Sequence, residues 1–193
     1  MVVQLNSPLL QRAPLPVQVP YTPNSEGLPQ LEGRVQVVTA AHRSFFTSVM
    51  AEAFRLAGQG MGVLVVQFLK GGANQGVDSP MNFCRSLDWF RCDLSFCVTE
   101  GYLQRADRRS QAQKAVTSLW QQTQERIAQG HDGLVVLDEL SLAMHWGLIP
   151  EGEVLQVLES RPIHLDVVLT GPHMPESLLN QADQITELRR PHL

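Results

Sequence analysis

The chain has 193 residues, of which 44% are hydrophobic and 18% charged, so it can bury a core of its own and is expected to be globular. Its formal net charge of −4 excludes a broad basic surface, so nucleic acid is not an expected partner. No apolar run approaches the roughly 20 residues that span a bilayer, and the first residues lack a secretion-signal pattern. We therefore expect a cytoplasmic protein that does not enter a membrane.

Residues 1–32 are predicted to form a proline-rich arm, and residues 33–193 an α/β domain. The arm holds six of the chain's 12 prolines, which favour an extended polyproline-type backbone over a helix. Its apolar residues, such as Leu9, Leu10 and Val17, leave two interpretations open. Part of the arm lies against the body or a neighbouring subunit, or the arm is a frayed tail.

From Gly33 onward, short apolar runs alternate with helical patterns. A strand is expected at 35–39, followed by a helix at 45–57 that closes at Gly58, a residue suited to a left-handed helix end. The run "VLVVQFL" at 63–69 predicts a second, buried strand, and the alternation at 90–98 indicates a third.

The second half of the domain repeats this pattern. The predicted elements are a long helix that ends at Gly130, a strand at 133–140, a helix at 140–147, a helix that begins at Pro150, a strand at 164–171 and a last helix at 175–181. Strands that alternate with helices predict a mostly parallel, doubly wound sheet of about five or six strands, with helices on both faces. The strand at 133–138 is expected near its centre because apolar runs flank it.

The segment "VVTAAHRSFFTSVM" at 37–50 is a strand–turn–helix junction of the kind that holds nucleotide phosphates in α/β proteins. Such a loop ordinarily offers glycines, a lysine and a serine or threonine. The residues from the turn into the helix are instead Ala40, Ala41, His42, Arg43, Ser44, Phe45, Phe46 and Thr47. The side chains that commonly bind phosphate are therefore missing where the fold would use them.

Three blocks of the domain resemble one protein family. They are "AGQGMGVLVVQFLKG" at 57–71, "GLVVLDELSLAMHWGLI" at 133–149 and "VVLTGPHMPESLLNQADQITEL" at 167–188. In order, spacing and residue type they are similar to the ATP:corrinoid adenosyltransferases of cobalamin biosynthesis, which are built on a P-loop NTPase fold. The resemblance implies a transferase that binds ATP, lets a Co(I) corrinoid attack the ribose 5′ carbon and releases triphosphate. It also implies a homodimer.

Carried over position by position, the resemblance implies a candidate ligand site. Asp138 falls on the acidic residue that helps to hold the metal ion, which makes it the candidate metal ligand, and Glu139 is its neighbour. Gln67 and Lys70 fall in a strand-end element close to the nucleotide. Gly171 begins a pair that the family usually completes with arginine, so a cation is missing there. In the other interpretation, the two carboxylates only cap the following helix or bind water.

The same alignment shows a degenerate phosphate loop. It puts the loop's glycines on Ala40, His42 and Ser44, its lysine on Phe45 and its metal-binding hydroxyl on Phe46. Side chains at the glycine positions oppose the backbone conformations that turn N–H groups around phosphates. Each lost charged contact is worth about 1.5 to 3 kcal/mol. The two phenyl rings either pack into the core or stack on an aromatic ligand.

Two functions compete at this point. The favoured one is a divergent family member that no longer binds triphosphate and serves as a non-catalytic binding or regulatory protein. Such a protein requires no cofactor and can have a protein partner. The alternative is an active corrinoid adenosyltransferase that uses Mg-ATP and a corrinoid, with its phosphate contacts moved to Arg43, Lys70 or a partner's arm. Arg43 and His42 either supply positive charge at the helix N-terminus or lie in a solvated turn. A homodimer is expected in both cases.

The remaining reactive side chains show no site of their own. The three cysteines match neither a CxxC metal site nor a disulfide framework, so they are expected to be packed or reduced thiols: Cys84, Cys92 and Cys97. Four histidines lack the spacing of metal ligands: His131, His145, His164 and His173. Trp146, close to the predicted site, is expected either to pack in the core or to form the wall of a pocket.

Overall fold

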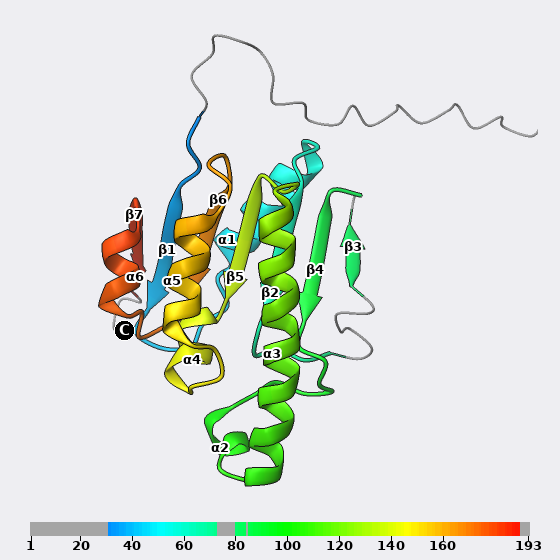
Figure 1. Ribbon diagram of the computed structural model, residues 1–193, viewed down its shortest axis with the longest axis vertical. Helices are drawn as coiled ribbons and strands as arrows, with labels where there is room; N and C mark the ends of the chain where they lie inside the picture. The colour runs from blue at the N-terminus through cyan, green and yellow to red at the C-terminus, as the bar shows by residue number, and fades with distance from the viewer. Residues whose placement is uncertain (1–30, 73–79, 84, 190–193) are drawn as a thin grey trace, which may run out of the picture. The chain divides into compact units, whose positions relative to one another are not determined.

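The computed structural model describes residues 31–72, 80–83 and 85–189 (Figure 1). Most of the predicted arm at 1–32, the greater part of the glycine-rich turn after residue 70, and Cys84 lie outside the described residues. The expected division into an arm and a domain therefore stays a prediction.

The body is built on one sheet of seven strands in the order β3-β4-β2-β5-β6-β1-β7. All neighbours pair in parallel except β3 and β4, which are antiparallel. The strands are β1 (Val35–Ala40), β2 (Val63–Gln67), β3 (Met81–Phe83), β4 (Leu87–Arg91), β5 (Leu134–Asp138), β6 (Asp166–Thr170) and β7 (Gln184–Leu188). The prediction of a mostly parallel α/β fold is confirmed, and β5 is the central strand.

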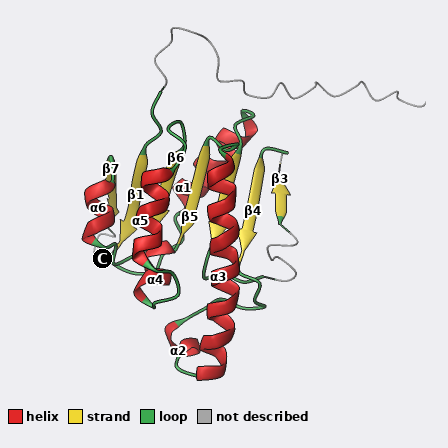
Figure 2. Ribbon diagram, in the orientation of Figure 1, coloured by secondary structure: helices red, strands yellow, loops and turns green. Residues whose placement is uncertain are grey.

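Helices cover both faces of this sheet, as predicted. They are α1 (Thr47–Gly58), α2 (Glu100–Leu103), α3 (Ala106–Gln129), α4 (Leu140–His145), α5 (Glu151–Ser160) and α6 (Glu176–Gln181). Figures 1 and 2 show α3 and α5 in front of the sheet and α1 behind it. Each face has its own hydrophobic cluster, one with α3 and α5 and the other with α1. None of the helices described here is long and apolar enough to cross a membrane.

The central strands explain why the polar residues at their ends come together. Every residue of β2 and of β5 is buried, as expected for parallel strands that are covered on both faces. In the parallel register, Gln67 pairs with Asp138 on one side and with Arg91 on the other. The last residues of β2, β4 and β5 therefore lie in one row at the carboxyl edge of the sheet.

The predicted count of five or six strands was wrong. The expected strand at 90–98 is displaced, because β4 ends at Arg91 and residues 92–98 are irregular. Leu94 and Val98 in that stretch are buried, but they do not form a strand ladder with the segment after β2. Each makes one backbone hydrogen bond to it: Gly72 N donates to Leu94 O at 3.0 Å, and Val98 N donates to Leu69 O at 2.8 Å. Their alternating burial comes from a loop packed on the end of a strand.

The helix boundaries also differ from those predicted. The helix expected at 45–57 begins at Thr47, because the backbone of Phe46 is not helical (φ −86°, ψ 75°), and this buried N-cap residue makes no side-chain capping hydrogen bond. The long polar helix is divided between α2 and α3, with Gln104 and Arg105 between them. Its predicted end is confirmed, since Gly130 closes α3 with a left-handed φ of 66°.

Candidate functional site

Several predicted site residues meet at the carboxyl edge of the sheet. Asp138 ends β5, Gln67 ends β2, and Thr170 ends β6, which is the neighbour of β5 on its other side. Ligands of open α/β sheets bind in this position, outside the carboxyl ends of the strands. The structure therefore brings these residues together, fully buried, at the edge of the sheet where open α/β folds place their ligands.

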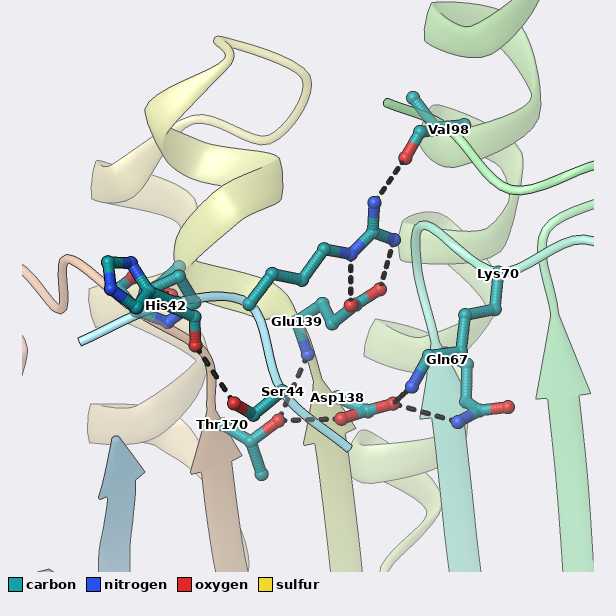
Figure 3. A network of polar contacts seen from close by, with 11 residues as sticks. His42, Ser44, Gln67, Lys70, Val98, Asp138, Glu139 and Thr170 are labelled. Carbon is teal, nitrogen blue, oxygen red and sulfur yellow. Dashed lines mark hydrogen bonds and ion pairs between the residues drawn. The ribbon is translucent and has the colours of Figure 1, made fainter. Parts of the chain in front are cut away.

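Asp138 is fully buried and accepts three hydrogen bonds (Figure 3). Its Oδ1 accepts from Thr170 Oγ1 at 2.7 Å, and its Oδ2 accepts from Gln67 Nε2 at 2.8 Å and from Lys70 Nζ at 2.7 Å. A buried carboxylate is costly unless it is paired and hydrogen-bonded. Lys70 supplies the balancing charge, with 19% of its side chain exposed.

The amide of Gln67 is oriented by two donors from β4. Its Oε1 accepts from Trp89 Nε1 and from Arg91 Nε, both at 2.9 Å. The amide nitrogen must then face Asp138, because the oxygen is already held on the other side. Sequence reasoning missed three residues of this network: Trp89, Arg91 and Thr170. The parallel register would have identified Arg91, which it puts beside Gln67, but not Trp89, which it puts beside Val65.

Glu139 forms a second ion pair next to the first. Its backbone has a left-handed φ of 61°, and its side chain is 2% exposed. Arg43 holds both carboxylate oxygens, with Nε to Oε1 at 2.5 Å and Nη2 to Oε2 at 2.7 Å, and donates from Nη1 to the Val98 carbonyl at 2.7 Å. Hydrogen bonding to Glu139 raises the pKa of Arg43 above its ordinary value, against the opposing effect of partial burial. This guanidinium joins the loop after β1 to the end of β5.

The loop between β1 and α1 places the two adjacent phenylalanines differently. Phe46 is 0% exposed within the cluster beneath α1, whereas Phe45 is 56% exposed, with Lys70 Nζ 4.9 Å from its ring centroid. Ser44 does not cap α1, because its hydroxyl donates to the His42 carbonyl at 3.2 Å. No residue from Ala40 to Phe46 has a positive φ. The left-handed conformations used by many phosphate-binding loops are absent from this stretch.

Gly171 lies beside the site and is required there by packing. Its φ is 132°, and a Cβ atom at this position would lie 2.2 Å from Ser141 Oγ. Its carbonyl accepts from Thr39 Oγ1 at 2.8 Å, which ties the end of β1 to the turn after β6. A side chain at residue 171 would strain this backbone conformation and would require the Ser141 hydroxyl to move.

The other predicted residues contribute unequally. Ala41 and His42 are exposed, and no side-chain contact joins them to the two ion pairs. Trp146 lies near the site, with the Arg43 guanidinium 6.0 Å from its ring centroid. The rings of His145 and His173 lie 5.6 Å apart. In the described ranges, no three His, Cys, Asp or Glu side chains are grouped as metal ligands would be.

The fold and site together define a P-loop NTPase-like α/β protein with its polar centre at the carboxyl edge of a mostly parallel sheet. The family model of the ATP:corrinoid adenosyltransferases BtuR/CobO/CobP matches residues 31–192, so the chain belongs to that family. The family resemblance found in the sequence is thereby confirmed.

Individual relatives agree with this assignment. A corrinoid adenosyltransferase of Pseudomonas aeruginosa is 32% identical over 143 residues, which cover 74% of this chain and 68% of that protein. The corrinoid adenosyltransferase CobA of Salmonella typhimurium is 29% identical over 157 residues, which cover 81% of this chain and 76% of that protein. An uncharacterized protein of Nostoc is 24% identical over 143 residues, which cover 71% of this chain and 38% of that protein.

Proposed function

We propose that the chain carries out the reaction of its family, the transfer of the adenosyl group of ATP to a reduced cobalt corrinoid. The observation that carries this proposal is the convergence of Arg43 and Lys70 on adjacent carboxylates at the carboxyl edge of the sheet. Both cations are partly accessible, with 31% and 19% of their side chains exposed. They are the positive charges that the site offers to a triphosphate in place of the lysine of a standard loop.

In this reaction the protein has to bind the substrates and stabilise the charge of the leaving triphosphate. Co(I) supplies an electron pair to the ribose 5′ carbon, a Co–C bond forms, and the C5′–O bond breaks with its electrons leaving on triphosphate. The planar guanidinium of Arg43 suits two phosphate oxygens at once, and the Lys70 ammonium acts as a point charge. Their role is to hold the triphosphate and to stabilise the charge that it gains as it leaves.

The comparisons support this proposal more than a loss of activity. The relatives from Pseudomonas aeruginosa and Salmonella typhimurium carry the name corrinoid adenosyltransferase, and the matched region includes every residue of the two ion pairs. The network around Asp138 fits a polar site that is still organised, since each donor is directed at a carboxylate oxygen.

A non-catalytic binding or regulatory protein is the second candidate, and the loop after β1 favours it. We regard the loop as degenerate, because a buried Phe46 stands where the family has a hydroxyl and no glycine lies between Ala40 and Phe46. A triphosphate must also compete with the Glu139 carboxylate, which Arg43 holds through two hydrogen bonds, before it gains a contact with Arg43. In this case the ion pairs stabilise the fold and the site binds no triphosphate.

An adenosylation assay separates the two candidates. ATP is added to the protein and a chemically reduced corrinoid, and formation of the Co–C bond is followed by absorbance. We expect product from the natural chain and about a tenfold or greater loss of rate in Arg43→Gln, which removes a charged hydrogen-bonding group. Arg55→Gln is the matched control, since Arg55 pairs with Glu52 on the exposed side of α1. Absence of product from the folded natural chain would support the non-catalytic candidate.

A further inference from the structure

Among the residues that the structure describes, the metal ion of the family has no suitable ligand set. Magnesium takes oxygen ligands in near-octahedral geometry and usually binds through one or two carboxylates together with substrate phosphates. Asp138 is the position that the resemblance assigns to the metal. Its Oδ1 already accepts from Thr170, and its Oδ2 accepts from both Gln67 and Lys70. An ammonium 2.7 Å from that oxygen occupies the place of a cation and would repel a second one.

The neighbouring groups do not compensate for this. Both oxygens of Glu139 are held by Arg43, and the side chain is 2% exposed. The position of the family's hydroxyl ligand is Phe46, whose ring is fully buried and supplies no oxygen. The carboxylates in this site are thus saturated by basic side chains, and the residues present do not fit Mg²⁺.

We infer that the site takes the triphosphate of ATP in its metal-free form, with Lys70 and Arg43 in the role of the divalent cation. This inference rests on the proposed function and specifies the ionic form of its substrate. The two side chains carry the formal charge of one Mg²⁺ ion, but Asp138 and Glu139 offset it, so a triphosphate must compete with these carboxylates for the N–H donors. They come from different segments, Lys70 after β2 and Arg43 after β1, but their partners Asp138 and Glu139 are consecutive residues, which brings both cations to the end of β5.

The contacts of Lys70 explain how it can serve in this way. Asp138 takes one of its N–H donors, and the exposed ring of Phe45 lies 4.9 Å from Nζ on a second side. An ammonium has three donors, so N–H groups remain for phosphate oxygens. The phenylalanine at the position of the family's lysine therefore helps to place a different lysine. Phe45 is a positioning residue in this arrangement.

The test compares ATP binding with and without magnesium. The full chain is titrated calorimetrically with ATP in EDTA and in excess Mg²⁺, at equal ionic strength. We expect the Kd in EDTA to be equal to or lower than the Kd in Mg²⁺. Lys70→Met should weaken binding in EDTA about tenfold, as the loss of a charged contact predicts. Lys114→Met, on the exposed face of α3, is the matched control and should change neither value.

The outcomes separate this inference from the proposal beneath it. Binding that is about tenfold or more tighter in Mg²⁺ than in EDTA would overturn the inference and leave the proposed function in place. No binding in either buffer would refute the proposed function, and the inference with it. Adenosyl transfer in EDTA at the rate seen with Mg²⁺ would support both. Circular dichroism of Lys70→Met checks that the variant is folded, and the comparison of buffers on the natural chain needs no variant.

Discussion

Phe46→Ala is expected to destabilise the protein far more than Phe45→Ala. The two residues are adjacent in the loop before α1, but Phe46 is 0% exposed and Phe45 is 56% exposed. Phe46 belongs to the cluster beneath α1 that includes Val49 and Met50. Its ring therefore contributes to the core, whereas the ring of Phe45 remains largely in water.

The magnitudes follow from this difference in burial. Removing a fully buried phenyl ring costs about 3 to 5 kcal/mol in the free energy of unfolding, because apolar contacts are lost and a cavity remains. Phe45→Ala loses its contact with Lys70, which is worth about 0.5 to 1 kcal/mol at an exposed site. A difference of at least about 2 kcal/mol between the two variants is expected.

Urea denaturation followed by circular dichroism measures both values. Similar m-values for the natural chain and the variants would show that the same surface is exposed on unfolding. If Phe46→Ala cost no more than Phe45→Ala, the buried position of Phe46 would be wrong, and the argument against a hydroxyl ligand there would fail. The same reasoning predicts that Phe45→Lys/Phe46→Thr loses stability without gaining Mg-ATP binding, because Ala40, His42 and Ser44 remain at the positions that the resemblance assigns to glycines.

Three further outcomes are expected. Iodoacetamide at about pH 8.5 should label the exposed Cys97 but not Cys92, because burial raises the pKa of the Cys92 thiol to about 12. Peptide mass spectrometry distinguishes the two sites, and labelling of native Cys92 would contradict its burial. Glu139→Gln should lower the Kd for ATP about tenfold, because a neutral amide holds Arg43 less strongly than a carboxylate does. Calorimetry measures this Kd, and an unchanged value would mean that Arg43 does not contact the nucleotide. We also propose a homodimer, which sedimentation at micromolar concentration would refute by showing a monomer.

The fold was predictable where the sequence pattern is long and apolar. The runs around β2 and β5 are buried at every position, so their composition alone indicates central parallel strands. β3 was missed because it has three residues and is mostly exposed, and β7 because four of its five residues are exposed. Edge strands of this kind bury too few side chains to produce a clear alternation of apolar and polar residues in the sequence.

The proximity of four candidate residues was predictable from the sequence, but their ion pairs were not, and their role in binding a ligand stays a prediction. The resemblance identified Asp138, Glu139, Gln67 and Lys70, and the structure brings all four to one edge of the sheet. The two ion pairs join residues that are far apart in the sequence: Arg43 and Glu139 are 96 positions apart, and Lys70 and Asp138 are 68 positions apart. Local sequence cannot specify such contacts, because they are fixed only when β1, β2 and β5 assume their order in the sheet.

The proposed loss of the loop's usual phosphate-binding residues does not leave this site without charge. Asp138 and Glu139 are adjacent and buried, and two carboxylates in such a place require cations, because removing one partner of a buried ion pair typically costs about 3 to 5 kcal/mol. Lys70 and Arg43 meet that requirement within the chain itself. Under the proposed function, a triphosphate would therefore compete with these carboxylates for cations that are already in place. Its affinity depends on how strongly Asp138 and Glu139 hold those cations, more than on how many phosphate-binding residues the loop retains.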